Sequence, residues 1–217
     1  MTTIKVDGVR SAQEAVTLET LGADLIGVAL SPNPRSPGTP VLTEEQAATI
    51  ADALIHAVLV TSMELTDRNQ VLRSVAATGA GLVQTITASI PPPDVRAALR
   101  EAGVGIVYSG LEINHDDDPG WVFGAFTDVP DLNAALFQVE VLPEYTGSWA
   151  FLRDESPEFA AEFQIADLDA LGRERPLVVG LDFTTGNVRE IIAALPWVRG
   201  IALTRGDAVR VLGAVGG

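Results

Sequence analysis

Short apolar runs alternate with helical patterns along almost the whole chain, and this alternation limits the possible folds most strongly. The runs with strand character cover residues 4–8, 24–30, 56–62, 82–87, 105–110, 137–142, 176–183 and 198–204. Strands that alternate with helices indicate parallel βαβ units. Eight such units in 217 residues favour a closed (β/α)8 barrel, the TIM barrel of the α/β class, as a single domain over residues 1–217. A dinucleotide-binding fold lacks support, because no G-x-G-x-x-G follows the first strand.

The segments between these runs carry helix signals. Helices are expected over residues 11–23, 42–54, 66–81, 91–104, 131–137, 156–172, 185–195 and 206–217. Ser11 with Glu14, and Thr43 with Gln46, have the spacing of a capping box. Residues 111–130 have no clear period, and "HDDDPG" within them is typical of a turn. His56 is expected to begin a buried strand in a structural role.

Composition narrows the class of partner. The chain has 29 acidic and 14 basic residues, so its net charge is −15. This charge argues against a nucleic-acid surface and against binding to anionic lipid. The sequence has no cysteine, which excludes disulfides and thiolate chemistry, and it has no membrane-length apolar run. A secretory signal is not expected, because "MTTIKVDG" lacks a long apolar region. We therefore expect a cytoplasmic protein, monomeric or homodimeric, that acts on a small molecule.

In a (β/α)8 barrel, ligands bind where the strands end. Polar and charged residues stand at or just after these ends in this sequence: Asp7, Arg35, Gln84, Glu112, His115, Glu140, Asp182, Thr204 and Arg205. Asp7 shares a strand face with Lys5, because side chains alternate along a strand. A pair with Lys5 or Arg35 is the structural alternative to a role for Asp7 as a general base.

Several motifs resemble the phosphoribosylanthranilate isomerase family. Residues 5–8 read K-V-D-G where the family has K-x-C-G, and "GADLIGV" at residues 22–28 matches its G-A-D-x-I-G-F. "SPNPRSP" stands at the family's strand-two loop, and Val83 and Gln84 begin its V-Q-L-H-G. "VVGLDFTTGNV" keeps Gly180, Leu181, Asn187 and Val188 of its strand-seven motif. The resemblance covers the chain from end to end.

The resemblance implies a (β/α)8 enzyme that carries out an Amadori rearrangement of a phosphoribosylated aromatic amine, with no cofactor. In the family, a strand-one cysteine is the base, a strand-six aspartate is the acid, and an arginine after strand two holds a carboxylate. In this sequence Asp7 stands at the position of the cysteine, and Arg35 matches the arginine. Glu140 is the closest match to the aspartate. Gly180 and Gly206 match phosphate-site glycines, whereas Val179, Ala202 and Arg205 depart from the family pattern.

The residues themselves suggest an anion site near the last strands. Thr185, Gly186 and Asn187 precede a helix, and the N-terminus of a helix favours phosphate. Thr185 is alternatively a simple N-cap. Arg205 adds a positive charge close by in the sequence, and Gln84 is a further candidate for substrate binding.

Three functions remain open at this point. The first is a divergent isomerase that uses Asp7 and Glu140 on a phosphorylated aminosugar or an analogue, in a role such as secondary metabolism. The second is a barrel that has lost catalysis and binds or regulates. The third is a metal-assisted lyase, with Asp7, Glu112, Glu140 and Asp182 near His115 as oxygen-rich ligands for Mg²⁺ or Mn²⁺. Lys5 is not favoured as a Schiff-base lysine. Trp149 either stacks on a ring of the ligand or packs against the barrel rim.

Overall fold

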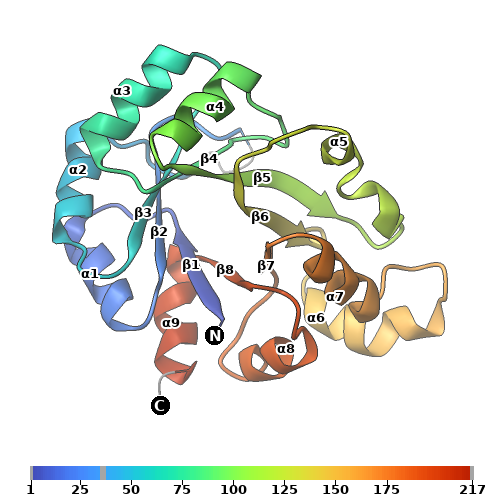
Figure 1. The fold of residues 1–217 in the computed structure, drawn as a ribbon. Coiled ribbons are helices and arrows are strands. Elements are labelled where there is room, and N and C mark those ends of the chain that lie inside the picture. Colours follow the sequence, from blue (N-terminus) through green and yellow to red (C-terminus); the bar gives the residue numbers. More distant parts are fainter. Residues whose placement is uncertain (1, 35–37, 216–217) are drawn as a thin grey trace.

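Parallel strands form a closed barrel in the computed structural model, which describes residues 2–34 and 38–215 (Figure 1). The eight strands follow one another around the barrel in chain order, and β8 pairs with β1. They are β1 (Thr3–Asp7), β2 (Leu25–Ala29), β3 (Val58–Ser62), β4 (Leu82–Gln84), β5 (Gly105–Ile113), β6 (Ala134–Val141), β7 (Leu177–Gly180) and β8 (Gly200–Thr204). The expected (β/α)8 class is confirmed.

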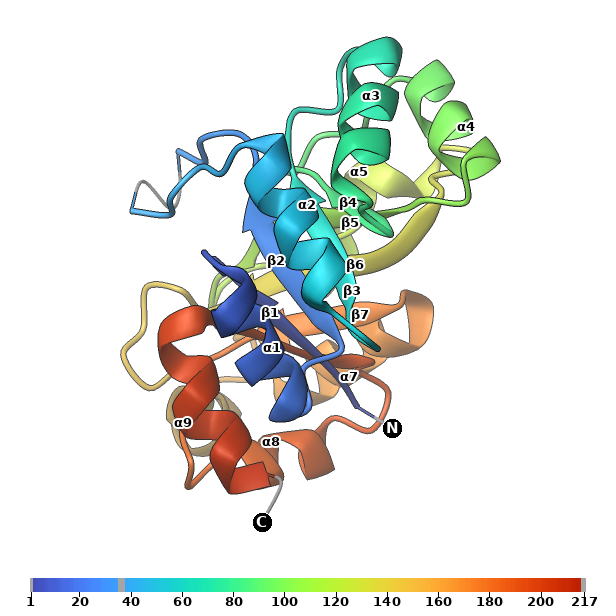
Figure 2. The same cartoon turned by 90° about the vertical axis from the view of Figure 1, so that its left-hand side faces the viewer.

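Helices surround this barrel and contact their neighbours in chain order over its first half (Figure 2). They are α1 (Ala12–Thr20), α2 (Glu44–Ala53), α3 (Arg68–Thr78), α4 (Pro93–Glu101), α5 (Gly124–Thr127), α6 (Ser148–Ala150), α7 (Ile165–Glu174), α8 (Val188–Ala194) and α9 (Arg205–Val215). Short turns of other helix types complete the connections: η1 (Pro119–Trp121), η2 (Phe151–Glu155) and η3 (Ser156–Glu158). The strand-to-helix loops therefore gather at one end of the barrel.

The two expected capping boxes have different outcomes. At α2, Thr43 Oγ1 accepts from Gln46 N–H and Gln46 Oε1 accepts from Thr43 N–H, so the box is complete. At α1, Ser11 Oγ accepts from Glu14 N–H at 3.3 Å. The Glu14 carboxylate takes the N–H of Arg10 instead of Ser11, so only half of that box forms.

Three sequence-based expectations are wrong. Residues 131–137 do not form a helix, because Ala134–Phe137 are the first half of β6 and pair with β5, and this pairing overrides the helix propensity of alanine and leucine. Only the later part of 156–172 is α-helical, because Ser156 Oγ donates to Phe163 O and the intervening residues form turns. His56 is exposed in a bend before β3 instead of beginning a buried strand.

The unpatterned stretch after residue 110 continues β5. This strand runs on to Ile113, and its register against β6 shifts between Tyr108 and Leu111. Ser109 and Gly110 form the bulge, and Gly110 has a φ of +79°, which favours glycine. The bulge reaches the end of the barrel where the strands terminate, and β-bulges are common next to binding sites.

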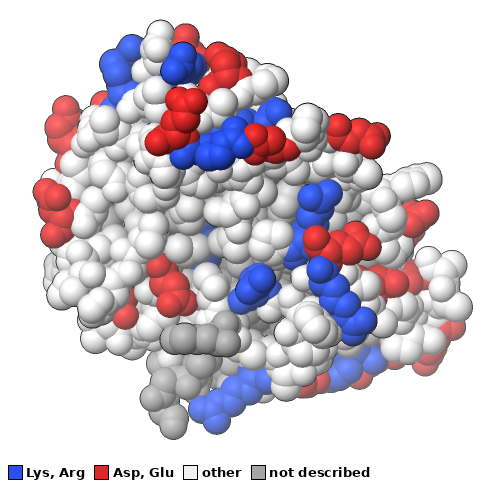
Figure 3. All heavy atoms as spheres, in the orientation of Figure 1, with Lys and Arg blue, Asp and Glu red and all other residues white. Residues whose placement is uncertain are grey.

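The charged surface is mixed in sign. On the face drawn in Figure 3, acidic and basic side chains are interspersed. Opposite charges also pair at the surface: Arg153 contacts Asp154 at 2.5 Å and Glu190 at 3.3 Å. Within residues 2–34 and 38–215, none of the helices has both the length and the apolar character needed to cross a membrane.

Candidate functional site

A cavity of about 490 Å³ opens where the barrel strands end. This volume lies in the range of small-molecule sites. Residues from β1, β2, β3, β4, β5, β6 and β8 reach it, together with loop residues after β2 and the start of α9. Its polar and charged lining includes Asp7, Arg10, Asn33, Thr39, Ser62, Gln84, Ser109, Glu112, Gln138, Glu140, Thr204 and Arg205.

Asp7 enters the cavity as the last residue of β1. Strand alternation places Lys5 two residues earlier on the same inner face. The Lys5 side chain is fully buried, and its ammonium group contacts both carboxylate oxygens of Asp7, whose side chain is 31% exposed. The ion pair with Lys5 therefore forms, and it leaves the Asp7 carboxylate facing the cavity.

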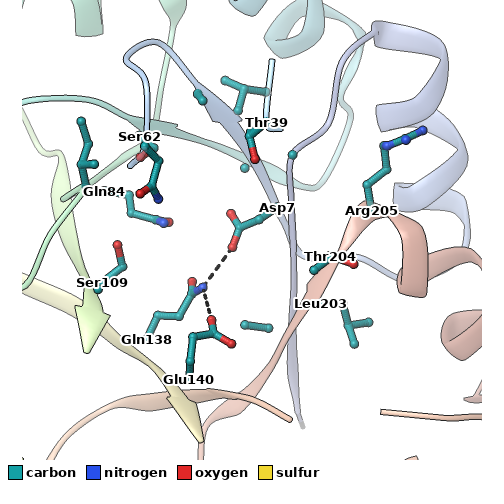
Figure 4. A pocket seen from close by; sticks show the side chains of 18 of the residues that line it. Asp7, Thr39, Ser62, Gln84, Ser109, Gln138, Glu140, Leu203, Thr204 and Arg205 are labelled. Atoms are coloured by element: carbon teal, nitrogen blue, oxygen red, sulfur yellow. Dashed lines mark hydrogen bonds between the residues drawn. The ribbon is translucent and has the colours of Figure 1, made fainter. Parts of the chain in front are cut away.

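Glu140 faces the same cavity from β6 (Figure 4). Gln138 Nε2 lies between the two acids and donates to Asp7 Oδ2 at 3.1 Å and to Glu140 Oε1 at 3.2 Å. Burial raises the pKa of Glu140, and the Asp7 charge raises it further, whereas the Gln138 hydrogen bond lowers it. Asp7 forms an ion pair and Glu140 is biased toward its neutral form, which is an arrangement suited to one base and one acid.

Two glycines make room for these carboxylates. A Cβ on Gly27 would lie 2.0 Å from Asp7 Oδ1, and a Cβ on Gly180 would lie 2.0 Å from Glu140 Oε2. Gly180 was expected to bind substrate. It does not line the cavity and instead lies directly behind Glu140.

Gly180→Ala is expected to lower any turnover that depends on Glu140 by about tenfold or more, because the new methyl group displaces the Glu140 carboxylate and small misplacements of a reacting group are costly. The free energy of unfolding should change by less than about 1 kcal/mol, since the displaced atoms are the end of a flexible side chain. Kinetics combined with urea denaturation would measure both quantities. Unchanged turnover would show that the position of Glu140 is unimportant.

Two arginines and a glycine lie at the rim of the cavity. Arg10, Arg205 and Gly206 all line it. The Arg205 guanidinium pairs with Glu14 Oε1 at 3.0 Å, and Figure 4 shows this side chain directed away from Asp7 and Glu140. Arg205 thus ties the start of α9 to α1, and Gly206 follows it in the first turn of that helix.

The other expected binding residues do not all gather here. Gln84, the last residue of β4, lines the cavity. Thr185 and Gly186 are exposed in the turn before α8 and do not line it. The N-cap of α8 is Asn187 and not Thr185. Arg35 lies outside the described residues.

The oxygen-rich cluster proposed for a metal does not form. Asp7, Glu112 and Glu140 line the cavity, but Asp182 does not, because it accepts from Ser148 Oγ and Trp149 N–H at 2.8 Å each. His115 lies by Glu144 instead, at 3.6 Å. Across the described ranges, no group of three or more histidine, aspartate and glutamate side chains is placed to hold a metal ion.

Trp149 and Gln138 complete the comparison with the sequence. Trp149 is buried in the hydrophobic core and does not line the cavity, so it packs the protein instead of stacking on a ligand. Gln138 was missed by the sequence reasoning. The alternation that places Glu140 on the inner face of β6 also places Gln138 there, and this signal was available.

Comparison with known proteins gives structural neighbours only. No family model matches the sequence, and no curated protein matches it. Among solved structures, N-(5'-phosphoribosyl)anthranilate isomerase from Pyrococcus furiosus has a TM-score of 0.71 at 14% identity, over 100% of this chain and 99% of that one. The two proteins share a fold.

Two further solved structures give the same result. One contains monomers generated from the dimeric phosphoribosylanthranilate isomerase of Thermotoga maritima, with a TM-score of 0.67, 14% identity and 99% and 97% coverage of the two chains. The other is a phosphoribosylanthranilate isomerase in complex with reduced 1-(o-carboxyphenylamino)-1-deoxyribulose 5-phosphate, with a TM-score of 0.67, 13% identity and coverage of 99% and 97%. The full-length match agrees with the family resemblance of the sequence motifs.

Proposed function

We propose that this protein is an isomerase similar to phosphoribosylanthranilate isomerase. Its proposed reaction is an Amadori-type rearrangement of a phosphorylated aminosugar or a close analogue. The observation that carries the proposal is the pair of carboxylates, Asp7 and Glu140, held on one amide group of Gln138 inside the cavity. The shared fold and the matching motifs support the choice of reaction.

The proposed reaction needs one acid and one base. Glu140 gives its proton to the ring oxygen of the sugar, the bond from that oxygen to C1 breaks, and the nitrogen lone pair forms an iminium. Asp7 then removes the proton on C2, and the electron pair forms the C1–C2 double bond of an enolamine. The hydroxyl proton on C2 returns to Glu140 and the proton on Asp7 goes to C1, which yields the ketone and resets both groups.

The physical properties of the two acids fit these roles. The raised pKa of Glu140 favours the protonated form that an acid needs, and burial is its main cause. Asp7 is paired with the Lys5 ammonium and is still partly exposed to the cavity, as a base must be. Phosphate is proposed to bind at the rim near Thr204, Arg205 and Gly206, where the N-terminus of α9 favours an anion.

The direct test is to supply phosphoribosylanthranilate and follow the loss of its fluorescence. Turnover that disappears in Asp7→Ala and persists in Asp52→Asn, an exposed carboxylate on α2, would support the proposal. Normal turnover in Asp7→Ala would remove Asp7 from the mechanism. If the compound raises the melting temperature of the wild type without reacting, the barrel binds ligand and does not catalyse this reaction.

The remaining expectations stay predictions. A monomer or a homodimer is proposed, since the Thermotoga maritima isomerase is described in dimeric and monomeric forms. A cytoplasmic location, and the absence of nucleic-acid and membrane partners, rest on the sequence alone. The metal-assisted lyase is not favoured, because its four expected ligands do not converge in the described chain.

A further inference from the structure

Two glutamine side chains, on β4 and β6, line the cavity (Figure 4). Gln84 is 8% exposed and Gln138 is 7% exposed, so both amides are more than nine-tenths buried. The Oε1 atoms of both have no hydrogen-bond partner within the described chain. Buried amide oxygens are normally hydrogen-bonded, so two unpaired oxygens on side chains that line one cavity point to a bound molecule as the missing partner.

The orientation of the Gln138 amide is fixed by its neighbours. Its Nε2 donates to Asp7 and to Glu140. Turning the amide over would place its oxygen against the Asp7 carboxylate, which is repulsive. The carbonyl oxygen must therefore be the atom without a partner, and it can only accept.

The charges around these oxygens determine what can approach them. Asp7 and Glu140 line the same cavity, and the ammonium of Lys5 already contacts both oxygens of Asp7. A carboxylate or phosphate placed here would face acceptors and acids. Hydroxyl and amine groups, in contrast, donate to amide oxygens without adding negative charge.

We propose that Gln84 and Gln138 are specificity residues that accept hydrogen bonds from the hydroxyl or amine groups of a sugar-like substrate, and that they reject a substrate carrying an anionic or apolar group at this position. Gln138 has a second role as a positioning residue, because the same amide orients Asp7 and Glu140. The inference deepens the proposed function by naming the part of the substrate that the cavity selects. It rests on the proposed function in one respect: the test compounds all carry a phosphate, because that function assigns one to the substrate.

Three phosphate esters test the selection by calorimetry on the full chain. D-ribitol 5-phosphate carries several hydroxyls, pentyl phosphate carries none, and 5-phospho-D-ribonate ends in a carboxylate. Ribitol 5-phosphate is expected to bind at least about tenfold more tightly than either of the others. Pentyl phosphate lacks the hydroxyls that the amide oxygens accept from, and the carboxylate of the ribonate would face Asp7 and Glu140, which line the same cavity. Equal affinities for ribitol 5-phosphate and pentyl phosphate would overturn the inference.

Variants then assign the selection to the two amides. Gln84→Leu and Gln138→Leu should each weaken the binding of ribitol 5-phosphate by about tenfold, and change that of pentyl phosphate by less than twofold. Gln70→Leu, on the exposed face of α3, is the matched control and should change neither affinity. Within the described chain, the Gln84 side chain makes no hydrogen bond to Asp7 or Glu140. Gln84→Leu therefore remains decisive if Gln138→Leu does not fold. A full preference for ribitol 5-phosphate in Gln84→Leu would remove Gln84 from the proposal.

The preference for the polyol and the turnover of phosphoribosylanthranilate can be confirmed or rejected independently of each other. Preference for the polyol without turnover of phosphoribosylanthranilate would keep the selection by the amides and reject the named reaction. Turnover without any preference would keep the reaction and reject the selection. A turnover assay of Gln138→Leu adds a kinetic readout, since loss of kcat beyond the loss in affinity reports its positioning of the two acids.

Discussion

Asp7→Asn is expected to destabilise the protein by about 3 kcal/mol, in addition to lowering turnover by about 10²- to 10⁴-fold. The loss of turnover follows from the removal of the proposed base. The loss of stability has another cause, because the substitution leaves the Lys5 ammonium fully buried without the carboxylate that it contacts. Urea denaturation and the fluorescence assay measure the two effects separately.

A double variant separates these effects within one protein. Lys5→Met combined with Asp7→Asn removes the buried charge together with its partner, and replacing a buried ion pair by neutral groups of similar size is often tolerated. The double variant should regain most of the lost stability and none of the lost turnover. If it remained as unstable as Asp7→Asn, the stranded ammonium would not be the cause. Recovered turnover would show that Asp7 only compensates Lys5.

Glu140→Gln is expected to reduce turnover by about 10²- to 10⁴-fold, because an amide cannot give up the proton that the proposed ring opening requires. The amide oxygen can still accept from Gln138, so the local hydrogen bond is kept. Glu64→Gln, an exposed glutamate beyond β3, is the matched control and should leave turnover unchanged. Turnover within a factor of two of the wild type in Glu140→Gln would exclude Glu140 as the acid.

The raised pKa of Glu140 also predicts how stability depends on pH. The unfolded chain releases this proton near the ordinary glutamate pKa, whereas the folded protein keeps it to higher pH. The wild type therefore loses stability as the pH rises from the ordinary value to the raised one. Glu140→Gln lacks this loss, so its melting temperature relative to the wild type should increase with pH across that window. A constant difference between the two proteins would contradict the raised pKa.

The barrel was predictable from the sequence because its strands and helices have different periods. The capping pair of Thr43 and Gln46 marked the start of α2, and the apolar runs marked all eight strands. Residues 131–137 were misassigned because an alanine-rich segment resembles a helix locally, and only its pairing with β5 makes it a strand. Long-range pairing of this kind leaves little trace in a short window of sequence.

The candidate site was predictable where a residue stands at or next to the end of a strand. Asp7, Gln84 and Glu140 follow from strand alternation, and they all line the cavity. Thr185 and Gly186 do not line it, because the chain turns before α8 in a direction that local sequence does not specify. The bridge from Gln138 to both acids depends on strands far apart in the chain, so the sequence shows its components but not their contact.

Lys5 is the only lysine among the 217 residues of the chain. Its side chain is inaccessible to solvent and touches the carboxylate at the base of the cavity. Protein grown with isotope-labelled lysine would therefore give one side-chain signal in a nuclear magnetic resonance spectrum. That signal would report ligand entry and proton movement at Asp7 directly, without any engineered probe.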